Sequence, residues 1–289
     1  MISELRGDGL IQIQAHNPRA LAWTVPAWAM LCGVIASGVF TLTAANVTRL
    51  LLALLLVEAS WGTLWRALST TGWAVLFRRW QNWRLGDRLF YLPYTQPASP
   101  LDRASRWAAQ LKSWAETLLF PTAGRSLKMI AAGVFFSLVI AGTLGSEMVM
   151  LTVASLSLME LAMVVKRESD QPAGEWDGIL RLGLPWLAGH LAFSPFTLSS
   201  VMLAAAFSVA IVGIGPASPR RGSVLWVTGQ ALAAFFLIPL RHPLSAAFLI
   251  LLLIPQLLLL TTHTGGSKRW TYPAWPWMAA GMMLTAWTL

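Results

Sequence analysis

Residues 243–262 read Pro-Leu-Ser-Ala-Ala-Phe-Leu-Ile-Leu-Leu-Leu-Ile-Pro-Gln-Leu-Leu-Leu-Leu-Thr-Thr, a run of 20 residues without a charge. A helix of about 20 apolar residues crosses the roughly 30 Å hydrocarbon core of a bilayer. Eight other runs of similar character occur along the chain. The nine runs are 20–44, 48–66, 127–145, 147–165, 178–194, 196–215, 223–240, 243–262 and 272–289. The sequence therefore predicts an all-α, polytopic membrane protein of nine transmembrane helices, arranged as a single membrane domain over residues 1–289.

The run 178–194 is the least regular, because Arg181, Pro185 and His190 interrupt it. Eight helices would remain without it. Residues 1–19 are polar and amphipathic, so we expect no cleavable signal peptide there.

The composition agrees with a membrane protein. The 289-residue chain is 56% hydrophobic and 11% charged, whereas soluble domains carry about 25% charged residues. The net charge of +9 lies mostly between the apolar runs. We therefore interpret the basic residues as topology determinants and contacts for lipid headgroups, not as a nucleic-acid surface. Cys32 is the only cysteine, which excludes an intramolecular disulfide and a thiolate metal site.

The distribution of Lys and Arg predicts the orientation. With the N-terminus in the cytoplasm and nine spans, cytoplasmic segments hold 19 of the 21 Lys and Arg residues. Only Arg49 and Arg241 then lie outside. Cytoplasmic loops of membrane proteins are enriched in Lys and Arg. We therefore expect the N-terminus inside and the C-terminus outside.

Residues 67–126 form the largest segment between the predicted spans, and we expect a cytoplasmic amphipathic region there. Two stretches, about 73–92 and 101–119, place apolar residues at helical spacing opposite Arg and Lys. The apolar residues are Trp73, Leu76, Phe77, Trp80, Trp83, Trp107, Leu111, Trp114 and Leu118. Such helices lie in the membrane interface, and a Trp- and Arg-rich surface also suits a protein partner. The sequence leaves both interpretations open.

Three motifs of aromatic, proline and small residues follow one another along the chain. The first motif comprises Trp23, Pro26, Trp28, Ala29, Cys32, Gly33, Ser37 and Gly38. The second is Gly-Leu-Pro-Trp-Leu-Ala-Gly at 183–189, followed by Leu198. The third comprises Gln256, Lys268, Arg269 and the Gly-Met-Met that begins at residue 281. Together these motifs resemble chlorophyll and bacteriochlorophyll synthases, which belong to the UbiA superfamily of intramembrane aromatic prenyltransferases. The resemblance implies the same nine-helix topology and a bacterial plasma or photosynthetic membrane.

The two Asp-rich motifs of that family are missing from this sequence. In the family, carboxylates hold Mg²⁺ ions that neutralise the departing diphosphate. Here the second predicted span continues as Glu-Ala-Ser-Trp-Gly-Thr-Leu-Trp-Arg from residue 58, and the loop at 214–223 contains no carboxylate. Arg220 and Arg221 in that loop are candidates for binding an anion or a lipid headgroup, but guanidinium groups do not ligate metals. We therefore expect no catalytic residues, no metal site, and a pseudoenzyme.

Other polar residues leave alternatives open. The segment 166–177 holds Glu168, Asp170, Glu175 and Asp177, which would have to supply the metal ligands in a divergent active prenyltransferase. Glu58 and Glu160 lie within predicted spans, where a charge is costly and indicates function or structural pairing. His190 is a candidate axial ligand for the magnesium of a chlorin, although a lone histidine near the membrane interface is more often a hydrogen-bonded structural residue.

The resemblance implies a non-catalytic membrane subunit that binds a pigment, quinone or lipid and associates with a photosynthetic complex. The candidate ligand-binding residues are Trp23, Trp28, Glu58, Pro185, Trp186 and His190. We expect no required cofactor, with chlorophyll or bacteriochlorophyll, carotenoid, quinone or lipid as bound molecules. The expected partners are membrane lipids and another membrane protein, such as a reaction centre or light-harvesting complex, which would contact the 67–126 region or the lipid-facing surface. A divergent prenyltransferase and a membrane transporter are the alternatives.

Overall fold

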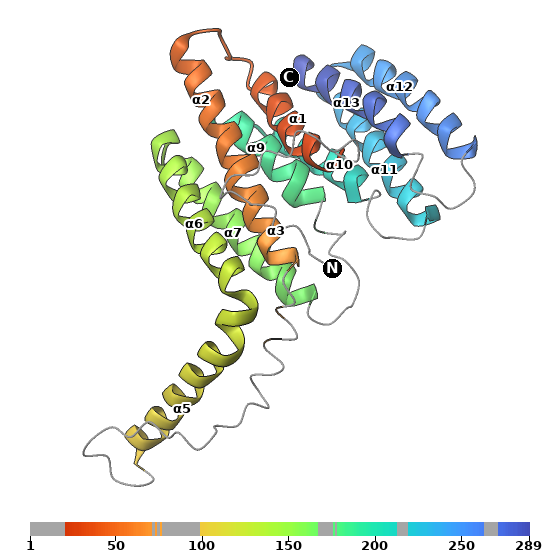
Figure 1. Cartoon of the computed structure of the whole chain (residues 1–289). Coiled ribbons are helices and arrows are strands. Elements are labelled where there is room, and N and C mark those ends of the chain that lie inside the picture. Colours follow the sequence, from red (N-terminus) through yellow and green to blue (C-terminus); the bar gives the residue numbers. More distant parts are fainter. Residues whose placement is uncertain are drawn as a thin grey trace, which may run out of the picture. The chain divides into compact units, whose positions relative to one another are not determined.

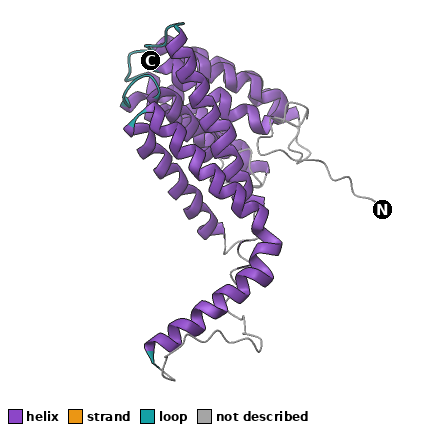
Figure 2. Ribbon diagram, turned by 60° about the vertical axis from the view of Figure 1, so that its left-hand side comes forward, coloured by secondary structure: helices purple, strands orange, loops and turns teal. Residues whose placement is uncertain are grey.

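The computed structural model describes residues 21–70, 73, 76, 99–166, 176, 178–212, 219–262 and 271–289. Throughout these residues the regular elements are helices, as Figure 2 shows. The predicted all-α class is therefore confirmed for the part of the chain that the structure describes. The chain divides into two compact units, one of Met1–Thr63 with Gly133–Leu289 and one of Leu64–Ala132.

Each predicted span contains helix, and the ends are shifted in every span except 243–262. The helices are α1 (Leu21–Ala36), α2 (Ala44–Leu54) with η1 (Leu55–Trp61) and α3 (Gly62–Thr70), α5 (Pro100–Trp114) with η2 (Ala115–Leu119) and α6 (Phe120–Leu144), α7 (Ser146–Lys166), η3 (Ile179–Gly183) with α9 (Leu184–Leu191), α10 (Leu198–Val212), α11 (Pro219–Leu237), α12 (Pro243–Thr262) and α13 (Thr271–Thr288). The η segments are turns of π-helix. The first predicted span is too long, because α1 ends at Ala36 and Gly38 follows it in the left-handed conformation (φ 68°) that terminates helices.

Four helices are long and apolar enough to cross a membrane among the residues described: Ala44–Ser69, Pro100–Leu144, Ser146–Val165 and Pro243–Thr261. Shorter apolar helices cover Val25–Ala36, Leu198–Val212 and Gly222–Leu237. The protein is therefore membrane-embedded. The count of nine spans and their orientation stay predictions.

The first unit contains a closed ring of helices. In order of contact around it are α1, α13, α12, α11, α10, η3 and α9, and α9 returns to α1. Figure 1 shows these helices side by side. Large side chains fill the centre of the ring, among them Trp186, Phe207 and Trp226, each fully buried. On the outside, η1 and α2 contact α1, and α7 contacts α9.

The second unit contains α5, η2 and the start of α6. We expected separate segments at 101–119 and 127–145, but one continuous helix runs from Pro100 to Leu144. The π-helical turn η2 lies directly before Pro121 in this helix. A proline ring would otherwise meet the carbonyl group four residues earlier, so a wider turn at this place lets the helix continue. A small apolar cluster of Leu76, Trp114 and Ala123 stabilises the unit.

Candidate functional site

Helix α1 and helix α9 approach each other through two glycines. A Cβ atom added to Gly33 would overlap the backbone of Trp186, and one added to Gly189 would overlap the backbone of Met30. Small residues allow such close crossings in membrane proteins, where backbone proximity increases van der Waals contact. Two of the three motifs that carry the family resemblance therefore meet at this crossing.

Trp186 and Pro185, both candidate ligand residues, are buried in the packing of the ring. The indole Nε1 of Trp186 donates to Ser200 Oγ at 3.0 Å, and its ring stacks on Phe207 with centroids 6.0 Å apart. Pro185 lies two residues beyond η3 in the same continuous helix, where the wider π-helical turn accommodates the proline ring. In this structure Trp186 joins α9 to α10.

His190 is also buried, and its Nε2 donates to the carbonyl oxygen of Pro195 at 3.0 Å. The bond closes the turn between α9 and α10. Trp28 has a similar role, because its Nε1 donates to the carbonyl oxygen of Ala279 at 3.1 Å and joins α1 to α13. Trp23 lies in α1, but its side chain is outside the described residues.

Helices α11 and α12 are joined by a network of buried amides. Gln256 Nε2 donates to Gln230 Oε1 at 2.9 Å, and Gln230 Nε2 donates to Gln256 Oε1 at 2.8 Å. Trp226 Nε1 donates to the same Gln256 Oε1 at 2.7 Å. Gln256 appeared in the sequence as part of a resemblance motif, whereas Gln230 went unnoticed. The sequence does contain a signal that could have identified Gln230. It is an isolated amide side chain within an apolar span, and such a group needs a hydrogen-bond partner in lipid.

Glu58 is the acidic candidate within a predicted span, and it lies in the π-helical turn η1. The other two π-helical turns each end two residues before a proline: η2 ends at Leu119 before Pro121, and η3 ends at Gly183 before Pro185. No proline follows η1 within the same helix. Because π-helical turns are often retained at functional sites, η1 is the one of the three whose presence points to function.

Buried apolar side chains lie beside Glu58 in the helix. Its Oε1 atom is buried, and Leu56 and Val57 beside it are buried too. Trp61, one turn further along, is 2% exposed. Its indole N–H has no hydrogen-bond acceptor among the described residues. A buried donor without an acceptor costs about 1–3 kcal/mol unless another molecule supplies the acceptor.

A second charged residue, Arg181, lies in the π-helical turn η3. Phe40 and Phe193 pack edge to face with centroids 5.3 Å apart, so the ends of α1 and α9 lie at one side of the first unit. At 1.5 Å per residue, Arg181 lies about 15 Å along its helix from Leu191, and Glu58 lies about 21 Å along its helix from Ala44. The turns η1 and η3 that hold them both pack against α1. Two residues of opposite charge therefore lie in turns that pack against the same helix, and Glu58 lies within the candidate span Ala44–Ser69.

Several candidate site residues lie in parts of the chain that the structure does not describe. The acids Glu168, Asp170, Glu175 and Asp177 lie outside the described residues, and so do the side chains of Arg220 and Arg221. Within the described residues no group of three or more His, Cys, Asp or Glu side chains is placed to hold a metal ion. Glu160 lies on α7 and is exposed.

The candidate site is thus the region around Glu58, Trp61 and Arg181, whose backbones flank α1. The other candidate residues, Trp28, Trp186 and His190, make the hydrogen bonds that hold the ring together. Comparison with known protein families, with curated proteins and with solved structures finds no match to this chain.

Proposed function

We propose that the protein is a non-catalytic membrane subunit that binds an amphiphilic molecule, a pigment, quinone or lipid, and associates with a membrane complex. The observation that carries this proposal is Glu58 in η1, an acidic residue at membrane depth in a π-helical turn without a proline to explain it. Ionisable residues within membrane spans are costly and are mostly kept for function.

The residues around Glu58 favour a particular kind of ligand. The buried indole N–H of Trp61 offers a hydrogen bond to an acceptor. Chlorins, quinones and lipid esters each carry a carbonyl oxygen that accepts such a bond, together with a long apolar tail. The tail would extend along apolar side chains, and the exposed surface of α6 and α7 provides many of these.

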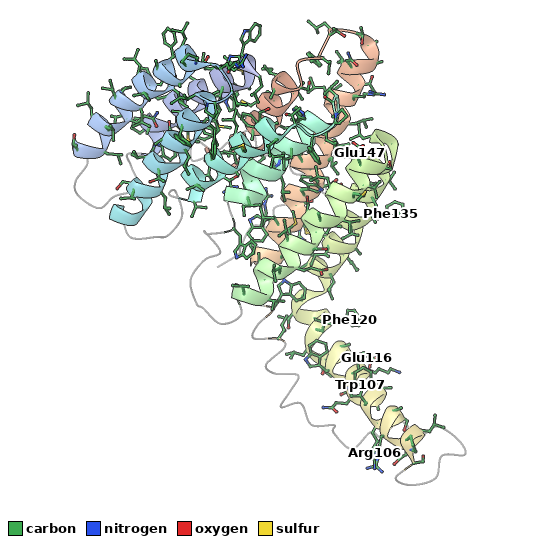
Figure 3. The ribbon with its side chains drawn as sticks, turned by 180° about the vertical axis from the view of Figure 1, so that it is seen from behind. Arg106, Trp107, Glu116, Phe120, Phe135 and Glu147 are labelled. Atoms are coloured by element: carbon green, nitrogen blue, oxygen red, sulfur yellow. The ribbon has the colours of Figure 1, made fainter. Side chains whose placement is uncertain are left out.

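A photosynthetic complex is the partner that the resemblance to chlorophyll synthases suggests. Phe135, Phe136, Met150 and Val164 are each more than half exposed on α6 and α7, where they face lipid or a neighbouring membrane protein. Figure 3 shows Phe135 projecting outward from α6. We propose that the protein acts in the complex by binding its partner through this surface, and not by catalysing a metal-dependent reaction.

The test is to extract the protein in a mild detergent and identify the molecules that copurify. We expect a bound pigment, quinone or lipid, and migration on a native gel as part of a larger complex. Replacing Glu58→Gln or Trp61→Phe should reduce the bound amphiphile several-fold while the protein stays monodisperse. The matched control is Trp186→Phe, which removes a structural indole N–H.

Two results would contradict the proposal. One is wild-type protein that carries no amphiphile beyond detergent and migrates as a free monomer. The other is full retention of the ligand in both variants. A ligand that exchanges across the bilayer during reconstituted flux measurements would instead establish the transporter alternative.

A further inference from the structure

Helix α7, which lies entirely within the first unit, has one buried face and one exposed face. The helix contacts α9 and η3. The side chains on its buried face include Met148, Leu151, Thr152, Ser155, Met159 and Ala162. The exposed face, called the outward face below, consists of Met150, Val153, Ala154, Ser157, Glu160, Leu161 and Val164. Their spacing of three or four residues places them along one side of the helix for most of its length.

Glu160 places a carboxylate on this face within a candidate membrane span. It is the only charged residue from Val149 to Val165, and the span covers Ser146–Val165. At 1.5 Å per residue, Glu160 lies about 8 Å along the helix from the nearer end of the span. The Cα–Cβ bonds of a helix tilt toward its N-terminus, so this side chain leans away from that end. A charge at such a place is costly and is mostly paired with another protein group.

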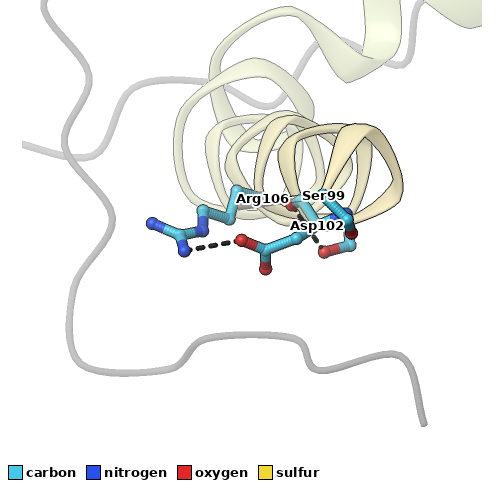
Figure 4. Close-up of polar contacts among 4 residues, drawn as sticks. Ser99, Asp102 and Arg106 are labelled. Carbon is cyan, nitrogen blue, oxygen red and sulfur yellow. Dashed lines mark hydrogen bonds and ion pairs between the residues drawn. The ribbon is translucent and has the colours of Figure 1, made fainter. Parts of the chain in front are cut away.

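The helix of Glu160 offers it no cation at pairing distance. Acidic residues on the helix that begins at Pro100 show the contrast. Asp102 pairs with Arg106 at 2.6 Å, as Figure 4 shows, and Glu116 lies 3.9 Å from Lys112. The positions three and four residues from Glu160 hold Leu156, Ser157, Met163 and Val164. Glu160 forms no ion pair with any residue that the structure describes. Its charge is therefore left for another molecule to neutralise.

Charge complementarity identifies that molecule as a helix with a basic residue. Lys or Arg on a neighbouring transmembrane helix would pair with Glu160 within the membrane. Ala154 and Ser157 are exposed on the same face, and small residues let a second helix approach closely. A symmetric dimer of this chain through the outward face would instead place two Glu160 carboxylates at the same depth, where they repel each other.

We propose that the outward face of α7 binds a transmembrane helix of another protein that carries Lys or Arg at the depth of Glu160. The inference rests on the proposed association with a membrane complex and states the chemistry of the partner. The apolar residues Met150 and Val164 contact the partner's apolar side chains, whereas Glu160 selects the partner that carries the matching charge.

The experiment measures energy transfer between the full-length protein and synthetic peptides in phosphatidylcholine vesicles. Cys32 is the only cysteine and is fully buried, so a donor fluorophore attaches at Ser146→Cys, an exposed position at the start of α7. The probes are two transmembrane peptides of Leu and Ala that carry the acceptor. One has a single Lys at the depth of Glu160, and the other has Leu at that position.

We expect the Lys peptide to associate several-fold more strongly than the Leu peptide. Replacing Glu160→Gln, an isosteric change at an exposed position, should abolish this difference. Replacing Glu160→Lys should reverse the selectivity, so that a peptide with Glu in place of Lys binds best. The matched control is Glu147→Gln, which removes a carboxylate from the first turn of the same helix, where Figure 3 labels it, and should leave the selectivity unchanged.

Equal association of the Lys and Leu peptides with the wild-type protein overturns the proposal. Energy transfer between two differently labelled copies of the protein, lost on Glu160→Gln, also overturns it, because the occupant would be a second copy. A native complex of unchanged size in the Glu160→Gln variant overturns this inference and leaves the proposed function standing. Selection of the Lys peptide by a protein that carries no amphiphile and migrates as a monomer supports the outward face and contradicts the proposed function alone.

Discussion

Gln230 and Gln256 exchange two hydrogen bonds, at 2.8 and 2.9 Å, across the interface between α11 and α12. Both side chains are fully buried, and Trp226 donates a third bond to the same network. The amide oxygen of Gln256 thus accepts two bonds at once. In an apolar environment each of these groups would be costly alone, so the network links the two helices in one register.

Replacing Gln256→Leu is expected to destabilise the protein by roughly 1–2 kcal/mol, because it leaves the amide of Gln230 and the indole N–H of Trp226 without their partner. The double variant Gln230→Leu with Gln256→Leu should be more stable than the sum of the single effects predicts. Unfolding in mixed detergent micelles, arranged as a double-mutant cycle, measures the coupling. If the changes in the free energy of unfolding for the two single variants add up to that of the double variant, the two glutamines have no coupling energy.

Replacing Gly33→Ala should prevent normal assembly of α1 with α9, because the new Cβ would overlap the backbone of Trp186. We expect a loss of roughly 3 kcal/mol, seen as a lower melting temperature and aggregation in size-exclusion chromatography. Gly142→Ala is the matched control, since nothing lies within 4 Å of a Cβ added there. If the two variants behave alike, the close crossing is not required.

Replacing His190→Ala should lower stability by roughly 2 kcal/mol, because the bond to the Pro195 carbonyl oxygen is lost and the turn after α9 loosens. Pigment bound per folded molecule should not change if His190 is structural. Thermal unfolding and the absorption spectrum are measured on the same sample. Loss of a pigment band without a change in melting temperature would show that His190 is a chlorin ligand.

The orientation is tested with reporters. One fused after residue 289 should be non-cytoplasmic, and one inserted near residue 98 should be cytoplasmic, because 19 of the 21 Lys and Arg residues then lie inside. Enzymatic reporters that are active on only one side of the membrane give the result. Both reporters on one side would contradict the nine-span arrangement.

No esterification above background is expected when the purified protein is incubated with chlorophyllide, geranylgeranyl or phytyl diphosphate, and Mg²⁺. The reason is the absence from the sequence of both carboxylate motifs that would stabilise the leaving diphosphate. Chromatography of the pigments measures the product. Turnover that disappears when Glu168, Asp170, Glu175 and Asp177 are replaced would establish the divergent prenyltransferase instead.

The sequence alone determined where the helices are. The run 243–262 became α12 with the same ends, and 147–165 became α7 with one residue more at each end. These elements are local, because in lipid a backbone must satisfy its own hydrogen bonds, and an apolar run of sufficient length can do so only as a helix.

Only the tertiary structure decided which faces meet. Nothing in the sequence pairs Gly33 with Trp186, or Gln230 with Gln256, because side chains distant in the chain come together only when helices pack. The continuity of the helix from Pro100 to Leu144 was missed for a different reason. A proline such as Pro121 ordinarily ends a helix, and the π-helical turn that accommodates it depends on hydrogen-bond geometry that sequence periodicity does not reveal. That Trp186 and His190 bind a ligand stays a prediction, and the packing gives each of them a hydrogen bond within the protein, from the Trp186 indole to Ser200 and from His190 Nε2 to the Pro195 carbonyl oxygen.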